Sequence, residues 1–248
     1  MIIIKSPQEI ARMRVPCLMV AEILDELSAA VAPGVTTKEL NTQALDACKK
    51  RKAVAAFKGY SGFPFAICSS PNDTIVHGFA TDVPLADGDI LSIDFGVLFD
   101  GFYGDSAVTV PVGCVSEDRK RLVDVTRKAL YAGINVVAPG VHLSDISHAV
   151  QCVAEEAGYS VVREFVGHGI GRALHEDPQV PNYGKPGVGP ILKPGMVLAI
   201  EPMVNAGSHQ VKILDDGWTA VTKDGSRSAH FEHSVAVTDD GFEILTSL

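Results

Sequence analysis

The sequence predicts an α+β domain in which two similar halves, each a pair of helices followed by antiparallel strands, share one core. Three observations lead to this class, and each is an internal repeat. The motif Val-Ala-Pro-Gly-Val occurs at residues 31–35 and again 106 residues later at 137–141. A strand-like motif that ends in an acid occurs at 85–94 and again 107 residues later at 192–201. Solenoid repeats are much shorter, roughly 20 to 50 residues, so the spacing indicates a duplicated half-domain.

The third repeat aligns Asp105–Val110 with Glu232–Val237. Acids therefore correspond across the repeat: Asp94 matches Glu201, and Asp105 matches Glu232. We expect the halves to span roughly residues 8–111 and 115–245 of a single domain covering residues 1–248, because no Ser/Gly-rich or Pro-rich linker divides them.

Helical signals open each half. Ser6 fits an N-cap, Pro7 fits the first helical position, and Glu9 completes a capping box. Apolar residues then recur at helical spacing as far as the Pro33-Gly34 break. The remaining helices are expected over residues 37–52, 117–137 and 144–157, the last of them ending at Gly158.

A hairpin is predicted where strand-like residues 90–97 and 102–111 flank Asp100-Gly101, one of the strongest short hairpin signals. With those two residues as the turn, Asp94 and Asp105 lie on the same face of the sheet as diagonal neighbours, roughly 7 to 8 Å apart along the backbone. The two carboxylates can then share one metal ion or bridge two.

Composition excludes several other classes of protein. A formal net charge of −9 argues against a bulk electrostatic grip on DNA, and no apolar run reaches the length of a membrane span. The first residues lack the basic and long apolar regions of a secretory signal, so we expect a cytoplasmic protein. Separately, we expect the protein to be a monomer. The cysteines indicate neither a disulfide framework nor a zinc finger, because they are widely spaced at positions 17, 48, 68, 114 and 152.

The acids Asp94, Glu201 and Glu232 lie in or beside apolar strand sequences, where an unpaired carboxylate is costly to bury. A single such acid could equally face solvent or accept backbone hydrogen bonds. Four acids at repeat-related positions, with Asp105 as the fourth, favour a bound cation instead. His168, in a Gly-rich segment, is the expected imidazole ligand, and this donor set suits two divalent ions of Co, Mn, Fe or Zn. A dinucleotide loop is a weak alternative for that segment, because no βαβ unit surrounds it.

These motifs resemble the type I methionine aminopeptidases of the short bacterial kind, and the resemblance covers essentially the whole chain. It rests on Gly167-His168-Gly169-Ile170-Gly171, Glu201-Pro202-Met203, Phe231-Glu232-His233 and Val76-His77-Gly78, together with the two aspartates. The resemblance implies the pita-bread fold of creatinases and aminopeptidases, with two pseudo-symmetric halves enclosing a dinuclear metal site. It also implies a hydrolase that removes the initiator methionine from nascent proteins and prefers a small second residue.

Within that family pattern, Asp94 would chelate one ion, Asp105 and Glu232 would bridge both, and His168 with Glu201 would complete the other. Glu201 would also carry a proton from water to the leaving amine. The pattern further assigns His77 and His175 to substrate contacts, although each histidine taken alone is more often a structural one. The implied lining of the methionine pocket is Tyr60, Phe63, Cys68, His77 and Trp218, while Phe65 could belong to the pocket or to the core.

Four features depart from the family pattern. Phe57 replaces a frequent Cys, Phe63 a frequent Tyr, and His230 a frequent Gln, and residues 68–73 differ from the usual Ser-x-Asn-Glu stretch. They leave the pocket shape and the metal preference open. Two other functions stay in view. A prolidase-like Xaa-Pro aminopeptidase would bring an additional N-terminal domain, and an inactive binding module of the same fold would not need five ligands. The implied partner is the N-terminal methionine of nascent polypeptides, and contact with the ribosome is left open.

Overall fold

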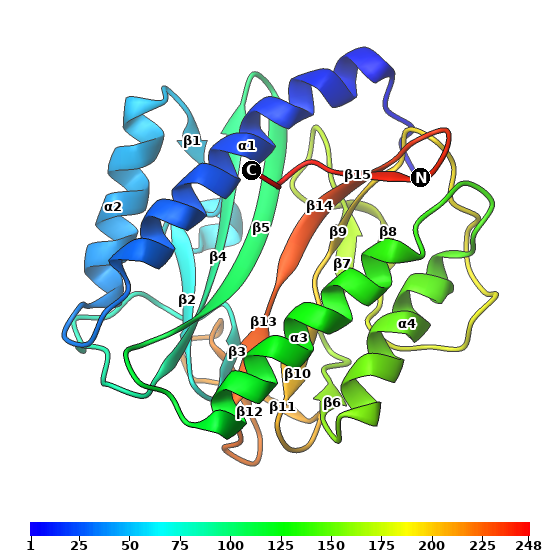
Figure 1. The fold of residues 1–248 in the computed structure, drawn as a ribbon. Helices are drawn as coiled ribbons and strands as arrows, with labels where there is room; N and C mark the ends of the chain where they lie inside the picture. Colours follow the sequence, from blue (N-terminus) through cyan, green and yellow to red (C-terminus); the bar gives the residue numbers. More distant parts are fainter.

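The computed structural model describes all residues 1–248 and contains four helices that lie on one face of a curved sheet (Figure 1). The helices are α1 (Pro7–Ala30), α2 (Thr37–Lys50), α3 (Glu117–Asn135) and α4 (Leu143–Glu156). A short 3-10 turn, η1, covers Tyr60–Gly62. The first-half strands are β1 (Val54–Ala55), β2 (Ile67–Pro71), β3 (Thr74–Val76), β4 (Ile90–Phe99) and β5 (Phe102–Pro111).

Ten shorter strands belong to the second half. They are β6 (Ser160–Val161), β7 (Gly167–Gly169), β8 (Glu176–Val180), β9 (Val197–Ile200), β10 (Met203–Asn205), β11 (Val211–Ile213), β12 (Ala220–Thr222), β13 (Ser228–His230), β14 (Glu232–Val237) and β15 (Phe242–Ile244). No helix in the protein combines the length and the apolar character that crossing a membrane requires.

Nine strands form the main sheet, in which every pairing is antiparallel. Its order is β1-β4-β5-β14-β9-β7-β8, with β2 also paired to β4 and β15 to β14. The halves of the chain meet where β5 pairs with β14, and Figure 1 shows these two strands side by side in the middle of the molecule. Two three-stranded sheets, β13-β10-β6 and β11-β12-β3, extend from this body.

The helix starts follow the local signals closely. Ser6 Oγ accepts the Glu9 N–H at 3.3 Å, and the Glu9 carboxylate accepts the Ser6 N–H at 3.0 Å, which confirms the capping box. The predicted ends were less accurate. The second helix stops at Lys50 rather than at residue 52, because Lys52 has a φ of +54° that a right-handed helix cannot contain. The third stops two residues short of Val137, and the fourth begins and ends one residue early.

The two halves repeat the same anchoring hydrogen bonds, as a pseudo-symmetric fold requires. The N–H of Gly34 donates to the carbonyl of Leu85 at 2.8 Å, and the Leu85 N–H donates back to Val35 at 2.8 Å. In the second half the matching bonds, at 3.0 and 2.8 Å, run from Gly140 to Leu192 and from Leu192 to Val141. Each repeated loop therefore fastens its helix pair to the strand motif that ends in an acid.

Alternation along β4 decides which side chains reach the helices. Ile93, Phe95 and Val97 are completely buried in one apolar cluster with residues of α1 and α2. Successive side chains of a strand point to opposite faces, so Asp94 and Gly96 face away from the helices. The predicted hairpin is confirmed: Asp100 and Gly101 form the turn with φ of +49° and +76°, and Gly96 pairs with Asp105. The carboxylates thus line the face of the sheet that the helices leave free.

Candidate metal centre and substrate cavity

A cavity of about 190 Å³ opens on the helix-free face of the sheet. Every residue that the sequence singled out as a ligand, catalytic group or pocket residue lines it. The lining residues are Phe57, Tyr60, Ser61, Phe63, Cys68, His77, Asp94, Asp105, His168, Leu174, His175, Glu201, Trp218 and Glu232. Residues that lie as far apart in sequence as Phe57 and Glu232 therefore share one small volume.

The five expected ligands come from five consecutive strands of the sheet. Asp94 lies on β4, Asp105 on β5, Glu232 at the start of β14, Glu201 directly after β9, and His168 on β7. Registers between neighbouring strands bring them level: Glu232 pairs with Ala107, and His168 pairs with Ala199. The seam between the halves therefore gathers the four repeat-related acids.

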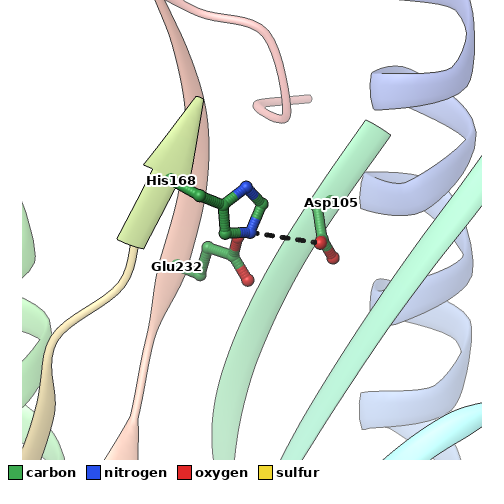
Figure 2. A group of neighbouring side chains, drawn as sticks. All are labelled: Asp105, His168 and Glu232. Atoms are coloured by element: carbon green, nitrogen blue, oxygen red, sulfur yellow. Dashed lines mark ion pairs between the residues drawn. The ribbon is translucent and has the colours of Figure 1, made fainter. Parts of the chain in front are cut away.

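Asp105, His168 and Glu232 form the tightest group, with one ligand atom from each lying within 4.8 Å of the others. Figure 2 shows the three side chains converging from their strands, with His168 Nε2 4.0 Å from Asp105 Oδ2. Glu201 adjoins them, because its Oε1 is 3.5 Å from His168 Nε2. Asp94 lines the same cavity but stands outside the group of three.

Burial makes the carboxylates reluctant to ionise. It raises the pKa of Asp94 to about 7 and that of Glu201 to about 8. The pKa values of Asp105 and Glu232 rise well above their usual range, first through burial and then through repulsion from the neighbouring acids. These four carboxyl groups therefore share a space with a strongly negative electrostatic potential and little solvent.

Several oxygens in that space have no protein partner. Asp94 Oδ1, Asp105 Oδ1 and Glu232 Oε1 are buried and accept no hydrogen bond. Leaving a buried carboxylate unpaired costs several kcal/mol, whereas bound divalent cations would satisfy these oxygens. Hard oxygen donors with one imidazole suit Mn, Fe, Co or Zn, so the residues fit a divalent metal centre.

The environment of His168 keeps its ring neutral, as a metal ligand requires. Burial lowers its pKa to about 4, so the ring is uncharged at neutral pH. Its Nδ1 lies 2.9 Å from the carbonyl oxygen of Gly169, which can only accept a hydrogen bond. The proton therefore resides on Nδ1, and Nε2 presents its lone pair to Asp105 and Glu201.

The other two cavity histidines stand around this centre. His175 accepts or donates a 2.7 Å hydrogen bond between its Nδ1 and the Tyr60 hydroxyl, and its ring centre is 4.3 Å from that of His168. His77 has a φ of +59°, an unfavourable value for a residue with a side chain, and its ring packs edge-on against Phe165. Burial lowers the pKa of His77 to about 4.

An aromatic wall closes the remaining side of the cavity. Phe63 packs edge-on against Trp218, with ring centres 5.2 Å apart. Behind it, Phe63 contacts Phe65 at 6.2 Å and Phe79 at 5.7 Å. Phe65 does not line the cavity, so it belongs to the packing behind the wall. Burial raises the pKa of the Cys68 thiol well above its usual range, which makes this residue an apolar part of the lining.

Sequence reasoning missed Ser61 and Leu174 in the lining and Phe79 and Phe165 behind it. Leu174 directly precedes His175 and Ser61 directly follows Tyr60, and that adjacency was the available signal for both. His230, the departure beside Glu232, is completely enclosed and its Nε2 has no hydrogen-bond partner. That nitrogen lies 3.6 Å from Glu201 Oε2.

Comparison with known proteins identifies the family of this chain and several of its relatives. Residues 11–239 match the model of metallopeptidase family M24. The chain is 54% identical to methionine aminopeptidase 1 of Bacillus subtilis, with 99% of both chains covered. It is 45% identical to the methionine aminopeptidase of Escherichia coli K12, covering 98% of this chain and 93% of that one.

Solved structures give the same neighbours. The methionine aminopeptidase of Rickettsia prowazekii superposes with a TM-score of 0.98 at 45% identity over 100% of both chains. The prolidase of Pyrococcus furiosus shares the fold, with a TM-score of 0.79 at 21% identity, and this chain covers 66% of its length. The predicted pita-bread fold is confirmed by these superpositions.

Proposed function

Because the chain belongs to metallopeptidase family M24 and, within it, to the methionine aminopeptidases, we propose that its cavity holds two divalent ions and uses His77, His175 and Glu201 to release N-terminal methionine. The observation that carries the proposal is the meeting of buried, unpartnered carboxylate oxygens with two histidines and an aromatic wall in one cavity. We assign the metal to Asp94, Asp105, His168, Glu201 and Glu232.

Divalent ions in this cradle would supply Lewis-acid activation of the scissile amide and of water. The rest of the chemistry falls to side chains. Glu201 is the acid next to His168, and its Oε1 lies 3.5 Å from His168 Nε2. We assign to it the transfer of a proton from water to the departing amine, which requires a group able both to accept and to donate.

His175 is assigned to the substrate carbonyl. When the Tyr60 hydroxyl donates to Nδ1, the ring proton resides on Nε2, which can then donate to the oxygen that gains charge during hydrolysis. His77, on the other side of the cavity beside Trp218, is assigned to the substrate's peptide nitrogen. Both rings are neutral near pH 7, because burial lowers the pKa of each.

Methionine specificity is assigned to the aromatic wall. Phe63 and Cys68 are 3% and 5% exposed and form the floor, whereas Tyr60 is 38% exposed and stands at the mouth. Aromatic rings and a thiol suit a flexible thioether side chain. The Tyr60–His175 hydrogen bond narrows the mouth, which supports a preference for a small second residue.

The proposal extends to the setting of the enzyme. We assign it to the cytoplasm, acting as a monomer of one catalytic domain on nascent polypeptides, with ribosome contact as an open part of that assignment. The ions are drawn from Co, Mn, Fe and Zn, which the donor set accommodates.

A peptide assay on metal-depleted protein tests the proposal. Chelator-treated, dialysed enzyme should cleave Met-Ala-Ser only after Mn²⁺, Co²⁺ or Fe²⁺ is restored, and metal analysis should find two ions per chain at full activity. Full activity of the depleted protein would contradict the metal assignment. Faster cleavage of Ala-Pro-Ser than of Met-Ala-Ser would instead favour the Xaa-Pro aminopeptidase.

A further inference from the structure

Lys5 and Glu176 form a buried ion pair outside the cavity lining. Their side chains are 3% and 4% exposed, and Lys5 Nζ lies 2.6 Å from Glu176 Oε2. Lysine is almost never fully buried unless it is paired, and burial of both charges carries a desolvation cost. The pair joins the segment before α1 to the first residue of β8.

The second oxygen of Glu176 closes the turn that presents His175. Glu176 Oε1 accepts the backbone N–H of Arg172 at 2.8 Å and that of Ala173 at 3.2 Å. These bonds fold residues 172–176 back on themselves, and His175 is the residue immediately before Glu176. One carboxylate therefore binds Lys5 on one side and the His175 turn on the other.

Two glycines make room for Lys5. A Cβ on Gly171 would lie 2.6 Å from Lys5 Cε and 2.7 Å from Glu176 Oε1. A Cβ on Gly195 would lie 2.5 Å from the Lys5 carbonyl oxygen, and the Lys5 N–H donates to the Gly195 carbonyl at 2.8 Å. Real Cβ atoms essentially never make such contacts, so Gly171 leaves room for the Lys5 side chain and Gly195 leaves room for the Lys5 backbone.

A purely mechanical tie of the N-terminal segment would not need buried charges. The segment already has such a tie at the surface, where the Met1 ammonium group pairs with Asp177. The helix that follows has another, because Arg14 Nη2 on α1 pairs with Glu243 Oε2 at 2.5 Å. A fully buried, hydrogen-bonded charge network has one geometry and resists displacement. The buried pair is thus suited to hold the adjacent His175 in place.

We propose that Lys5 and Glu176 are positioning residues that hold the His175 ring against Tyr60 and His168. The inference rests on the proposed function for the role of His175 in hydrolysis. Loss of Lys5 leaves the Glu176 carboxylate buried without its cation, so the 172–176 turn relaxes and His175 moves from its place above the metal centre. The chemical step then slows while methionine still enters its pocket, because the aromatic wall lies on other segments.

The test combines kinetics with a double-mutant cycle. Lys5→Met and Glu176→Gln should each lower kcat for Met-Ala-Ser about tenfold or more, with KM changed less than about threefold, since a small misplacement of a catalytic group acts on the transition state. When either change is added to a His175→Ala variant, kcat should fall by less than about twofold relative to His175→Ala alone. Lys5→Arg keeps the charge and should restore part of the loss. Arg14→Met, which breaks a partly exposed ion pair on the helix that follows this segment, should leave kcat unchanged.

A second readout does not depend on catalysis. Imidazole NMR signals of His175, assigned in the metal-free protein by their loss in His175→Ala, should shift in Lys5→Met and Glu176→Gln but not in Arg14→Met. Glu176→Gln preserves the acceptor for Arg172 and serves if Lys5→Met does not fold. Two results would overturn the inference. One is that the His175 signals do not shift in Lys5→Met or Glu176→Gln. The other is that each change lowers kcat by the same factor in the His175→Ala background as in the unmodified enzyme. Failure of the unmodified enzyme to cleave Met-Ala-Ser would count against the proposed function instead, and the NMR result would still decide the positioning role.

Discussion

His230 Nε2 lies 3.6 Å from Oε2 of Glu201, while the other oxygen of that carboxylate lies 3.5 Å from His168 Nε2. Each oxygen of Glu201 therefore faces an imidazole nitrogen, one inside the cavity and one from a completely enclosed residue behind it. The orientation of the assigned proton carrier therefore depends on both imidazole rings.

Replacement of Glu201 by Ala removes an assigned ligand and the assigned proton carrier together. We expect kcat for Met-Ala-Ser to fall by about 10³-fold or more, because general acid–base groups alone contribute roughly 10² to 10⁴. Steady-state kinetics at saturating Mn²⁺ measure the loss, and circular dichroism checks the fold. Glu164→Ala, an exposed acid outside the cavity, is the control. Turnover within tenfold of the unmodified enzyme would refute the assignment.

Replacement of His230 by Leu removes the nitrogen that faces Glu201. We expect Mn²⁺ affinity to fall about tenfold, because groups that orient ligands from behind typically contribute roughly 10 to 100-fold in affinity. His230→Gln keeps an N–H donor near Glu201 and should stay within about threefold. Calorimetric titration of the metal-depleted protein compares the three. Equal affinities for Leu and Gln variants would mean that His230 only fills space.

Removal of metal should lower the unfolding temperature, since the ions bind the folded state and leave unpaired carboxylates when withdrawn. Asp105→Asn removes one of the repelling charges. We expect this variant to be more stable than the unmodified protein when both are metal-free, by about 1 to 2 kcal/mol, and to gain little from added Mn²⁺. Scanning calorimetry with and without chelator gives both values. A metal-free variant that melts lower than its parent would contradict this account of the repulsion.

Acid should destabilise the metal-free protein through its buried histidines. Burial lowers the pKa of His77 to about 4 from an ordinary value of 6.5. The unfolded chain therefore takes up a proton below pH 6.5 that the folded chain refuses until about pH 4, and stability falls as pH falls through that window. The full difference amounts to about 3 kcal/mol for this group.

Urea unfolding between pH 7 and 4 measures the effect. His77→Phe should reduce the loss of stability across the window, because phenylalanine takes up no proton and can still pack against Phe165 and Trp218. Equal slopes in His77→Phe and in the parent protein would contradict the prediction.

Short-range features were readable from the sequence because short-range physics produces them. The capping box at Ser6 and Glu9 involves residues three positions apart, and the Asp100-Gly101 turn sets the register of the hairpin that it joins. Strand alternation then decides that Asp94 and Asp105 share a face. The internal repeat extended this reasoning to Glu201 and Glu232, since equivalent sequences adopt equivalent places in a pseudo-symmetric fold.

Longer-range relationships required the folded chain. Phe65 could not be separated from the pocket lining by composition, because only the packing of Phe63 and Phe79 around it decides which ring reaches the cavity. The helix ends differed by one or two residues for the same reason, since backbone geometry at a terminus responds to what packs beyond it.

The sequence by itself determined the class of fold, the identity of the acids and histidine in the cavity, and the shared face of Asp94 and Asp105, because repeats, turn chemistry and alternation are local properties. Only the tertiary structure decided that β5 pairs with β14, that His230 stands behind Glu201, and that a buried Lys5 reaches across the molecule to the His175 turn. The paired residues Glu232 and Ala107 lie 125 positions apart, and Lys5 and Glu176 lie 171 apart, and no local pattern encodes contacts over such separations. They arise when two cores pack against one sheet, where burial and hydrogen bonding select a single arrangement.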